Sequence, residues 1–317
     1  MRLATAIALV PALLLASCIG RRGPPTPAGY PEAVSLLGAP LYAVERPLER
    51  RQQLEADLAV AYAAYERNPD DADALIWLGR RVAYLGRYRD AIGIFSEGIR
   101  RHPNDPRMYR HRGHRWITVR EFDRAVQDLQ HAARLLRGRP DTVEPDGIPN
   151  ALGVPLSTLH YNVWYHLGLA HYLRGEFNQA LYAFRNALAV SRNDDSRVAA
   201  TDWAYMTLRR LGREEDAAAV LESIGPGMEI IENDSYYRRL LLYKGLLPPD
   251  SLLARIGDDA VTLTTQAYGV GNWHLYNGRV DEAEEIFWTV TSSEDWAPFG
   301  YIAAEADLRR MLRRRRN

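Results

Sequence analysis

ALIWLGRRVAYLGRYRDAIGIFSEGIRRHPND, residues 74–105, has the pattern of two helices that fold back on each other. Gly79 and Ala91 are small enough to let the two helices approach closely, and large apolar residues such as Phe95 fill the space between them. Pro103 ends the second helix, because proline lacks the backbone N–H that would continue it. The segment therefore predicts one helical hairpin.

The same residue types recur along the chain at one spacing. Gly79 and Gly113 lie 34 residues apart, and Ala91 and Ala125 share that spacing. A fixed period of this length is typical of repeat proteins, in which stacked units bury a continuous core. The sequence therefore predicts an array of hairpins.

The hairpin segment resembles the tetratricopeptide repeat in Leu78-Gly79, Gly86, Tyr88, Ala91, Phe95 and Pro103. Further copies follow in register, and the resemblance covers residues 45 to 313. It implies an all-α fold, an α-solenoid of about five to six helical hairpins with a C-terminal capping helix. Within a solenoid of residues 45–317, the expected units are a half-repeat 45–71, repeats 72–105 and 106–139, an insert loop 140–160, repeats 161–194 and 198–231, a distorted repeat 232–263, a repeat 264–297 and a cap helix 298–317.

The N-terminal residues have the features of an export signal. Leu3 to Leu15 is apolar, too short to span a membrane, and follows a basic start. The sequence Leu15-Ala16-Ser17-Cys18 resembles a bacterial lipobox, which implies a signal peptide at 1–17 and acylation (palmitate) at Cys18, followed by a proline-rich tether at 18–44. The alternative is an ordinary secretory signal with an incidental cysteine. The resemblance implies a lipid-anchored protein of the cell envelope, in the outer membrane and facing the periplasm.

The first helices of tetratricopeptide repeats line a concave groove, so the resemblance also implies a binding surface. The residues expected there are cationic near the N-terminal end and aromatic further along. They are Arg80, Arg107, Arg110, His111, His114, Asn162, Tyr165, His166, Tyr172, Trp203, Arg209, Tyr268, Asn272 and Tyr276. Arginine forks pair with carboxylates, so we expect a protein or peptide partner with an anionic group. The alternative is that these polar residues are merely solvated.

The insert loop 140–160 departs from the repeat pattern and follows the arginine-rich repeat directly. It contains three acids, Asp141, Glu144 and Asp146. We expect it to fold over the groove edge and to pair an acid with Arg107 or Arg110, as a lid or a competitor for an anionic ligand. Two alternatives remain open: a solvated loop, or a pocket beneath it for a small anionic or glycan ligand.

Other functions receive little support. Basic and acidic residues number 40 each, so the chain lacks the positive field of a nucleic-acid binder. The sequence contains no nucleophile elbow, HExxH motif or phosphate-binding glycine loop, and we expect neither an enzyme nor a cofactor. His111 and His114 share a helical face with metal-ligand spacing, but flanking arginines oppose a metal. The basic tail at 309–317 fits either an anionic lipid patch or a solvated helix end.

These features together predict a non-catalytic, membrane-anchored scaffold or adaptor. By analogy of anchor and repeat, such a protein acts in envelope assembly or recruits proteases or cell-wall hydrolases.

Overall fold

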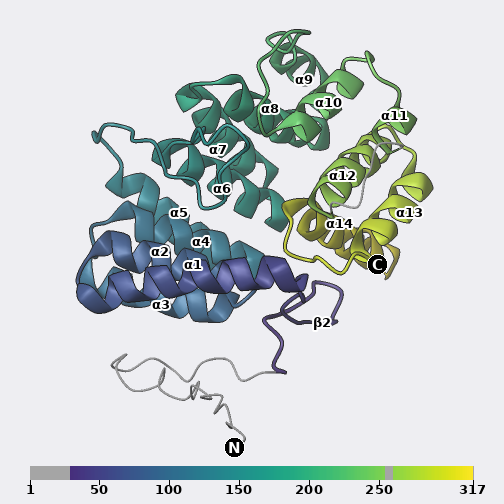
Figure 1. Cartoon of the computed structure of the whole chain (residues 1–317). Coiled ribbons are helices and arrows are strands. Elements are labelled where there is room, and N and C mark those ends of the chain that lie inside the picture. Colours follow the sequence, from purple (N-terminus) through teal and green to yellow (C-terminus); the bar gives the residue numbers. More distant parts are fainter. Residues whose placement is uncertain (1–28, 254–259, 317) are drawn as a thin grey trace, which may run out of the picture.

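The computed structural model describes residues 29–253 and 260–316, and within them the chain is an α-solenoid (Figure 1). The chain first forms a small antiparallel hairpin of β1 (Ala33–Val34) and β2 (Pro40–Leu41). The helices are α1 (Leu48–Arg67), α2 (Ala72–Tyr84), α3 (Tyr88–Arg101), α4 (Pro106–Thr118), α5 (Phe122–Leu135), α6 (Leu159–Arg174), α7 (Phe177–Val190), α8 (Asp194–Arg210), α9 (Glu214–Val220), α10 (Asp234–Tyr243), α11 (Pro249–Leu253), α12 (Ala260–Tyr276), α13 (Val280–Thr291) and α14 (Phe299–Arg316). The predicted all-α solenoid fold is confirmed.

One packing joint recurs in the hairpins. Gly79 of α2 lies so close to Phe95 of α3 that an added Cβ would come within 2.5 Å of the ring. The equivalent distances are 2.7 Å for Gly113 against Leu129, 2.5 Å for Gly168 against Phe184 and 2.7 Å for Gly271 against Phe287. A glycine on the first helix thus receives a large buried side chain from the second, which explains the spacing seen in the sequence.

The turns inside the hairpins need a left-handed residue. Gly86, Gly175, Gly212 and Gly278 have φ between 71° and 82° at these turns. In the second repeat the turn residue is Arg120, with φ 67°, which is an uncommon conformation for a residue with a side chain.

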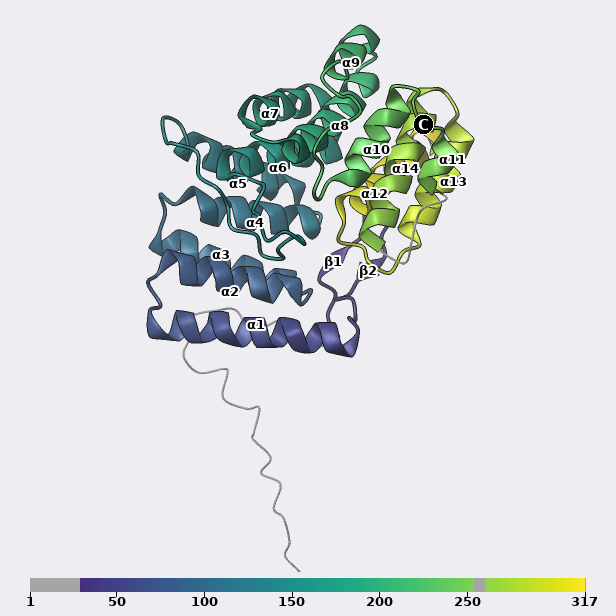
Figure 2. The same cartoon turned by 45° about the horizontal axis from the view of Figure 1, so that its top comes forward.

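The two ends of the described chain meet. The indole N–H of Trp296, between α13 and α14, donates to the carbonyl of Tyr42 at 2.6 Å, and Arg46 pairs with Asp295 at 2.9 Å. Glu32 accepts a hydrogen bond from the backbone N–H of Arg89 at 2.8 Å. Figure 2 shows the β-hairpin lying between the first helices and the C-terminal ones.

The last helix does more than end the solenoid. α14 packs on α12 and α13 and also reaches α6 across the concave side. Its carboxylates Glu305 and Asp307 are buried and pair with Arg120 and Arg210, at 2.9 and 2.6 Å. Because burying two carboxylates is costly unless each has a partner, these pairs define where α14 docks.

No helix within the described ranges has both the length and the hydropathy needed to cross a membrane. The expected signal peptide 1–17 and Cys18 lie outside the described residues.

Candidate functional site

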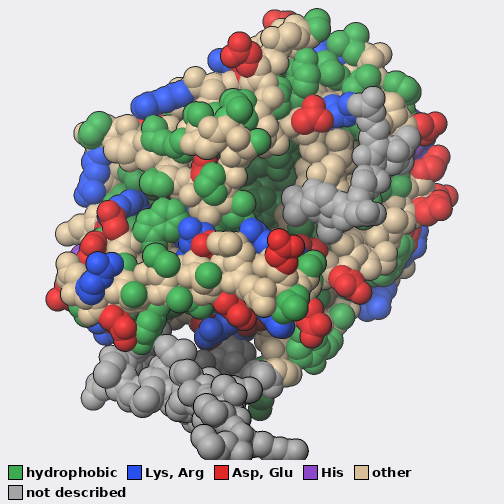
Figure 3. All heavy atoms as spheres, viewed as in Figure 1, with side chains coloured by type: hydrophobic (Ala, Val, Ile, Leu, Met, Phe, Trp, Pro, Cys, Tyr) green, Lys and Arg blue, Asp and Glu red, His purple; other side chains and the backbone are tan. Residues whose placement is uncertain are grey.

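Six basic side chains gather on the concave side where α2, α4 and α6 meet. We call this group the cationic recess; it consists of Arg80, Arg110, His111, His114, Arg115 and His166. Figure 3 shows this face hollowed near its centre, with Lys or Arg side chains along the rim of the hollow.

The histidines of the recess are packed with aromatic rings. His114 and His166 stand with ring centroids 4.4 Å apart, and Phe299 at the start of α14 contacts them at 5.2 and 5.6 Å. His111 stacks on Phe95 at 5.4 Å. The imidazole Nδ1–H of His166 donates to the carbonyl of Asn162 at 2.6 Å, a contact available to its neutral form. The rings are therefore held by packing on their own chain.

Glu144 of the insert loop enters the recess. Its carboxylate lies 3.0 Å from Nη2 of Arg110 and 3.6 Å from Nε2 of His111, and the Asn162 side-chain amide donates to it at 3.1 Å. Over the described ranges, Glu144 is the one carboxylate that pairs with an arginine of the recess. Arg115 instead lies over the ring of Tyr88, 5.5 Å from its centroid.

The rest of the loop is fastened nearby by backbone carbonyls. Nη1 of Arg80 donates to the carbonyl of Pro145 at 2.8 Å, and Nη1 of Arg81 donates to that of Gly147 at 2.9 Å. Of the three loop acids, only Glu144 enters the recess. Asp141 accepts from the backbone N–H of His160 at 3.0 Å and faces Arg192 at 3.5 Å.

Asp146 and Arg107 lie apart from this contact. Burial raises the pKa of Asp146, and the charge of Glu232 raises it further. Arg107 faces Asp105 and Asp73 at 2.6 and 2.5 Å, so the structure pairs it with two acids of the preceding repeat and not with the loop. Of the two arginines expected to meet a loop acid, Arg110 does so through Glu144, and Arg107 does not because two nearer carboxylates satisfy its guanidinium.

The recess has an excess of positive potential. Burial lowers the pKa of His111, His114 and His166 well below the usual value, and neighbouring arginines lower each further. Burial also lowers the pKa of Arg115 to about 10, against the opposing influence of Tyr88 and Tyr84. At neutral pH the histidines are uncharged and the arginines charged. The three arginines of the recess therefore face a single described carboxylate, that of Glu144.

Four residues expected along an open groove lie in the interior instead. Tyr172, Tyr268 and Asn272 are 0% exposed and Trp203 is 1% exposed. The hydroxyls of Tyr172 and Tyr268 are 2.8 Å apart, Asn272 donates to the first at 3.1 Å, and the second donates to Asp307 of α14 at 3.0 Å. For these four residues the predicted lining is wrong, because α12 and α14 close this part of the concave side.

The remaining candidates fall into two places. Asn162 and Tyr165 are buried next to the recess, and the Tyr165 hydroxyl donates to that of Tyr236 at 3.1 Å. Arg209 lies over the ring of Tyr276 at 4.6 Å, near the turn of the fourth repeat, in a separate partly exposed pair. Among the described residues there is no group of three or more His, Cys, Asp or Glu that could hold a metal ion.

Two residues of the site were missed in the sequence. Arg115 lies four residues after His111, so it shares that helical face and could have been included. Phe299 carried no such signal, because its contact with His114 depends on where α14 docks.

Two segments of the chain, residues 48–106 and 161–194, match family models of the tetratricopeptide repeat. The chain thus contains these repeats, as its sequence suggested. No curated protein sequence matches the chain.

Solved structures similar to this one include MamA, at 14% identity over 64% of this chain and 97% of MamA, with a TM-score of 0.42. Another is YrrB, at 14% identity over 78% of this chain and 97% of YrrB, with a TM-score of 0.41. A third, a kinesin light chain-like repeat protein of Podospora anserina, is 12% identical over 71% of this chain and 95% of its own, with a TM-score of 0.43.

Proposed function

We propose that this chain is a non-catalytic scaffold that binds a protein or peptide partner, and that the partner places a carboxylate or another anionic group in the cationic recess. One observation carries the proposal: Arg80, Arg110 and Arg115 converge there, and a loop inserted between two repeats supplies Glu144 as the counterion. A partner's carboxylate replaces Glu144 as the counterion of Arg110, in an ion pair strengthened by the low local dielectric.

The surroundings of the recess limit the size of what enters. The loop covers one side, and Phe299 closes another. This favours a short segment, such as a C-terminal carboxylate or one acidic side chain, over a long helix along the whole concave side. The loop contacts of Arg80 and Arg81 end on backbone carbonyls, so displacing the loop leaves buried Arg110 as the arginine that loses a counterion, and the partner's carboxylate takes that place.

The partner is tested by cross-linking in cells that express the full chain, followed by purification from membranes. Arg115 forms no ion pair with a described residue, so Arg115→Met preserves the fold while removing positive charge from the recess, and we expect cross-linked partners to be lost. Glu144→Gln removes the internal competitor and should increase partner recovery. Arg209→Gln, at the separate pair, is the control. Unchanged partners in both recess variants would refute the proposal.

The enclosure of the recess also favours a second candidate, the binding of a small anion or glycan beneath the loop. Titration calorimetry with inorganic phosphate and with citrate tests the anion directly. Saturable binding by the wild-type chain that is lost in Arg115→Met supports a small anion. If partners are recovered by cross-linking and calorimetry shows no binding of phosphate or citrate, the result supports the scaffold that binds a protein or peptide.

We also propose that Cys18 is acylated and anchors the chain in the cell envelope, at the outer membrane and facing the periplasm. Support comes from the lipobox-like Leu15-Ala16-Ser17-Cys18 and from the preceding apolar stretch. In that setting the scaffold acts in envelope assembly or recruits proteases or cell-wall hydrolases. Labelled palmitate should enter the wild-type chain and not Cys18→Ser, and the variant should leave the membrane fraction.

A further inference from the structure

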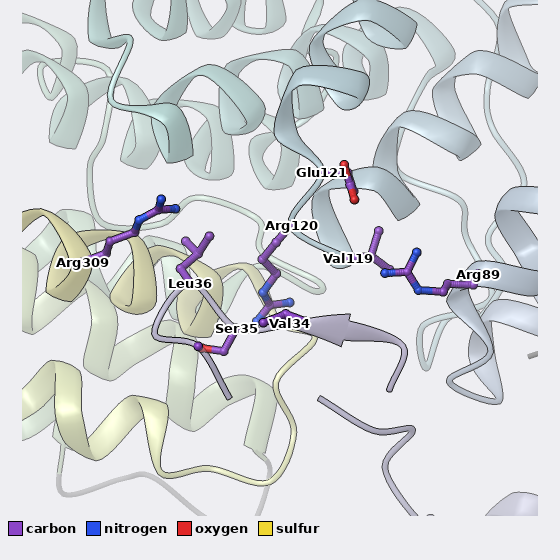
Figure 4. Close-up of a pocket in the computed structure, with 9 residues that line it drawn as sticks. Val34, Ser35, Leu36, Arg89, Val119, Arg120, Glu121 and Arg309 are labelled. Atoms are coloured by element: carbon purple, nitrogen blue, oxygen red, sulfur yellow. The ribbon is translucent and has the colours of Figure 1, made fainter. Parts of the chain in front are cut away.

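A second positively charged surface lies where the β-hairpin meets α14, outside the cationic recess. A cavity of about 390 Å³ is lined there by the hairpin, the α4–α5 turn and Arg309 of α14, and Figure 4 shows Arg309 and Arg89 at its two ends, with Arg120 between them. An adjoining cavity of about 290 Å³ shares Leu36 and Arg309 with the first. We call this surface the basic face; it consists of Leu36, Leu37, Arg89, Trp288, Arg309, Leu312, Arg313 and Arg316.

Five of the six arginines of α14 differ in whether they pair within the chain. Arg310 pairs with Asp307 at 2.8 Å and donates to the carbonyl of Leu173 at 3.0 Å, and Arg315 pairs with Glu284. Arg309, Arg313 and Arg316 are exposed, and none forms an ion pair with a described residue. Their spacing of four and three residues places them on one stripe of the helix. Arg310 and Arg315 thus hold the fold together, and the stripe of Arg309, Arg313 and Arg316 carries free charge outward.

The lining carries little opposing charge. Glu121 is the one carboxylate among the residues that line the two cavities, and it faces Arg124 at 3.9 Å. Arg120 is occupied internally by Glu305, so it does not add to the free charge. The basic face therefore has a net positive charge available to an external group.

Apolar side chains lie beside these arginines. Trp288 of α13 is 45% exposed and Val34 of the hairpin is 55% exposed. Leu36, Leu37 and Leu312 are partly exposed in the same lining. Tryptophan beside leucine and arginine is the combination found at membrane surfaces, where the ring enters the head-group layer and the guanidinium groups meet lipid phosphates.

The position of the basic face along the chain also favours contact with a membrane. The hairpin follows Gly29 closely, and the 11 residues from Cys18 to Gly29 extend at most about 40 Å. A lipid on Cys18 therefore holds the hairpin, and the basic face beside it, near the bilayer.

We infer that the basic face docks on anionic phospholipid head groups of the membrane that carries the anchor. This inference rests on the proposed acylation of Cys18, which brings the face to the surface. Docking orients the solenoid, so that the cationic recess keeps one orientation toward its partner.

The test uses the full acylated chain, purified from membranes and reconstituted into vesicles that contain a brominated phosphatidylcholine. One set of vesicles adds an equal part of phosphatidylglycerol, and the other contains phosphatidylcholine alone. Bromine quenches tryptophan fluorescence at close range, and subtraction of the Trp288→Phe signal isolates Trp288. We expect strong quenching of Trp288 in the anionic vesicles and at least a fivefold weaker effect in the neutral ones.

The charge requirement is tested by Arg309→Gln/Arg313→Gln/Arg316→Gln, which should reduce the quenching in anionic vesicles to the neutral level. The matched control, Arg137→Gln/Arg139→Gln/Arg185→Gln, removes three exposed arginines elsewhere and should leave it unchanged. Equal quenching in both kinds of vesicle, or an equal loss in both triple variants, overturns the inference. So does free phosphate, matched to the lipid phosphate concentration, if it abolishes the quenching.

Co-sedimentation of the same samples separates this inference from the anchor. A chain that sediments with vesicles but shows no quenching of Trp288 is anchored without docking, which overturns the basic face alone. A chain that stays in the supernatant overturns the anchor and the inference together.

Discussion

Nε of Arg120 lies 2.9 Å from a carboxylate oxygen of Glu305, and the two residues are 185 positions apart. Both side chains are buried, at 3% and 0% exposure. Arg120 also donates to the carbonyl of Trp296 at 2.9 Å. Arg120 has a left-handed backbone conformation at this turn, a position that glycine occupies in other repeats. The second repeat thus accepts backbone strain at this turn in order to hold α14.

Arg120→Ala should lower the free energy of unfolding by about 3 kcal/mol, because it leaves the buried carboxylate of Glu305 unpaired. Arg120→Gly should cost about 1 kcal/mol less, because glycine adopts a positive φ without strain. Urea unfolding measures both. If the two variants are equally unstable, the turn is not strained. Hydrogen exchange should show faster opening of α14 in each variant.

The glycine joint predicts opposite effects of one substitution at two sites. Gly168→Ala places a methyl group 2.5 Å from the buried ring of Phe184, and we expect a loss of about 2 kcal/mol in the free energy of unfolding. Gly93→Ala in α3 meets no atom within 4 Å and should gain about 0.5–1 kcal/mol from helix propensity. Thermal and urea unfolding of the two variants test this prediction. A similar effect at both sites would contradict the close packing of Gly168 against Phe184.

The buried pair of Asp202 on α8 and Arg239 on α10 predicts a stability change that depends on pH. Burial raises the pKa of Asp202 to about 6, and Arg239 opposes this rise. Arg239→Met removes the opposition, so folded Asp202 keeps its proton at a pH where the unfolded chain has lost it. The free energy of unfolding of Arg239→Met therefore falls as the pH rises. Between pH 5.5 and 7.5, the free energy of unfolding of the variant should fall by about 2 kcal/mol more than that of the wild type.

Urea unfolding at the two pH values measures this loss. Asp202→Asn/Arg239→Met is the control, because it has no carboxyl group to titrate at this position. A cost of Arg239→Met that is independent of pH would show that Asp202 does not take up a proton.

The histidines of the cationic recess predict the opposite dependence. The pKa of His114 is lowered by burial first and then by Arg115, so the unfolded chain binds a proton near pH 6.5 that the folded chain does not. Stability present above that pH is lost as the pH falls, by at most about 1.4 kcal/mol per pH unit for one histidine. His114→Gln should reduce this acid sensitivity.

The charged and titratable groups that act on His114 are Arg115, Arg110 and His111 on its own helix α4 and His166 on α6. The measurement is urea unfolding of wild type and variant at about pH 7.5 and 5.5. An identical drop in both proteins would mean that His114 is protonated in the folded state.

The sequence contained enough to place the helical hairpins, because the residues that join two helices of a repeat recur at 34-residue spacing. Gly79 and Phe95 illustrate this: their contact lies within one hairpin, so local periodicity reveals it. The placement of Arg110 and His111 on the concave side followed from the resemblance to tetratricopeptide repeats together with the helical period. That Glu144, rather than Asp141 or Asp146, meets Arg110 could not be read from the sequence, because the loop has no periodic structure.

Tertiary structure alone decided which part of the concave groove is closed. Tyr172 and Tyr268 have the spacing of groove residues, yet they are buried because α14 brings Asp307 against them. The position of α14 depends on Arg120 and Arg210, which lie 185 and 97 residues from their carboxylates. Local patterns specify which faces of a helix are apolar or charged. Which distant segment covers a face depends on the curvature of the whole solenoid, and on the buried charges that find partners only when its ends meet.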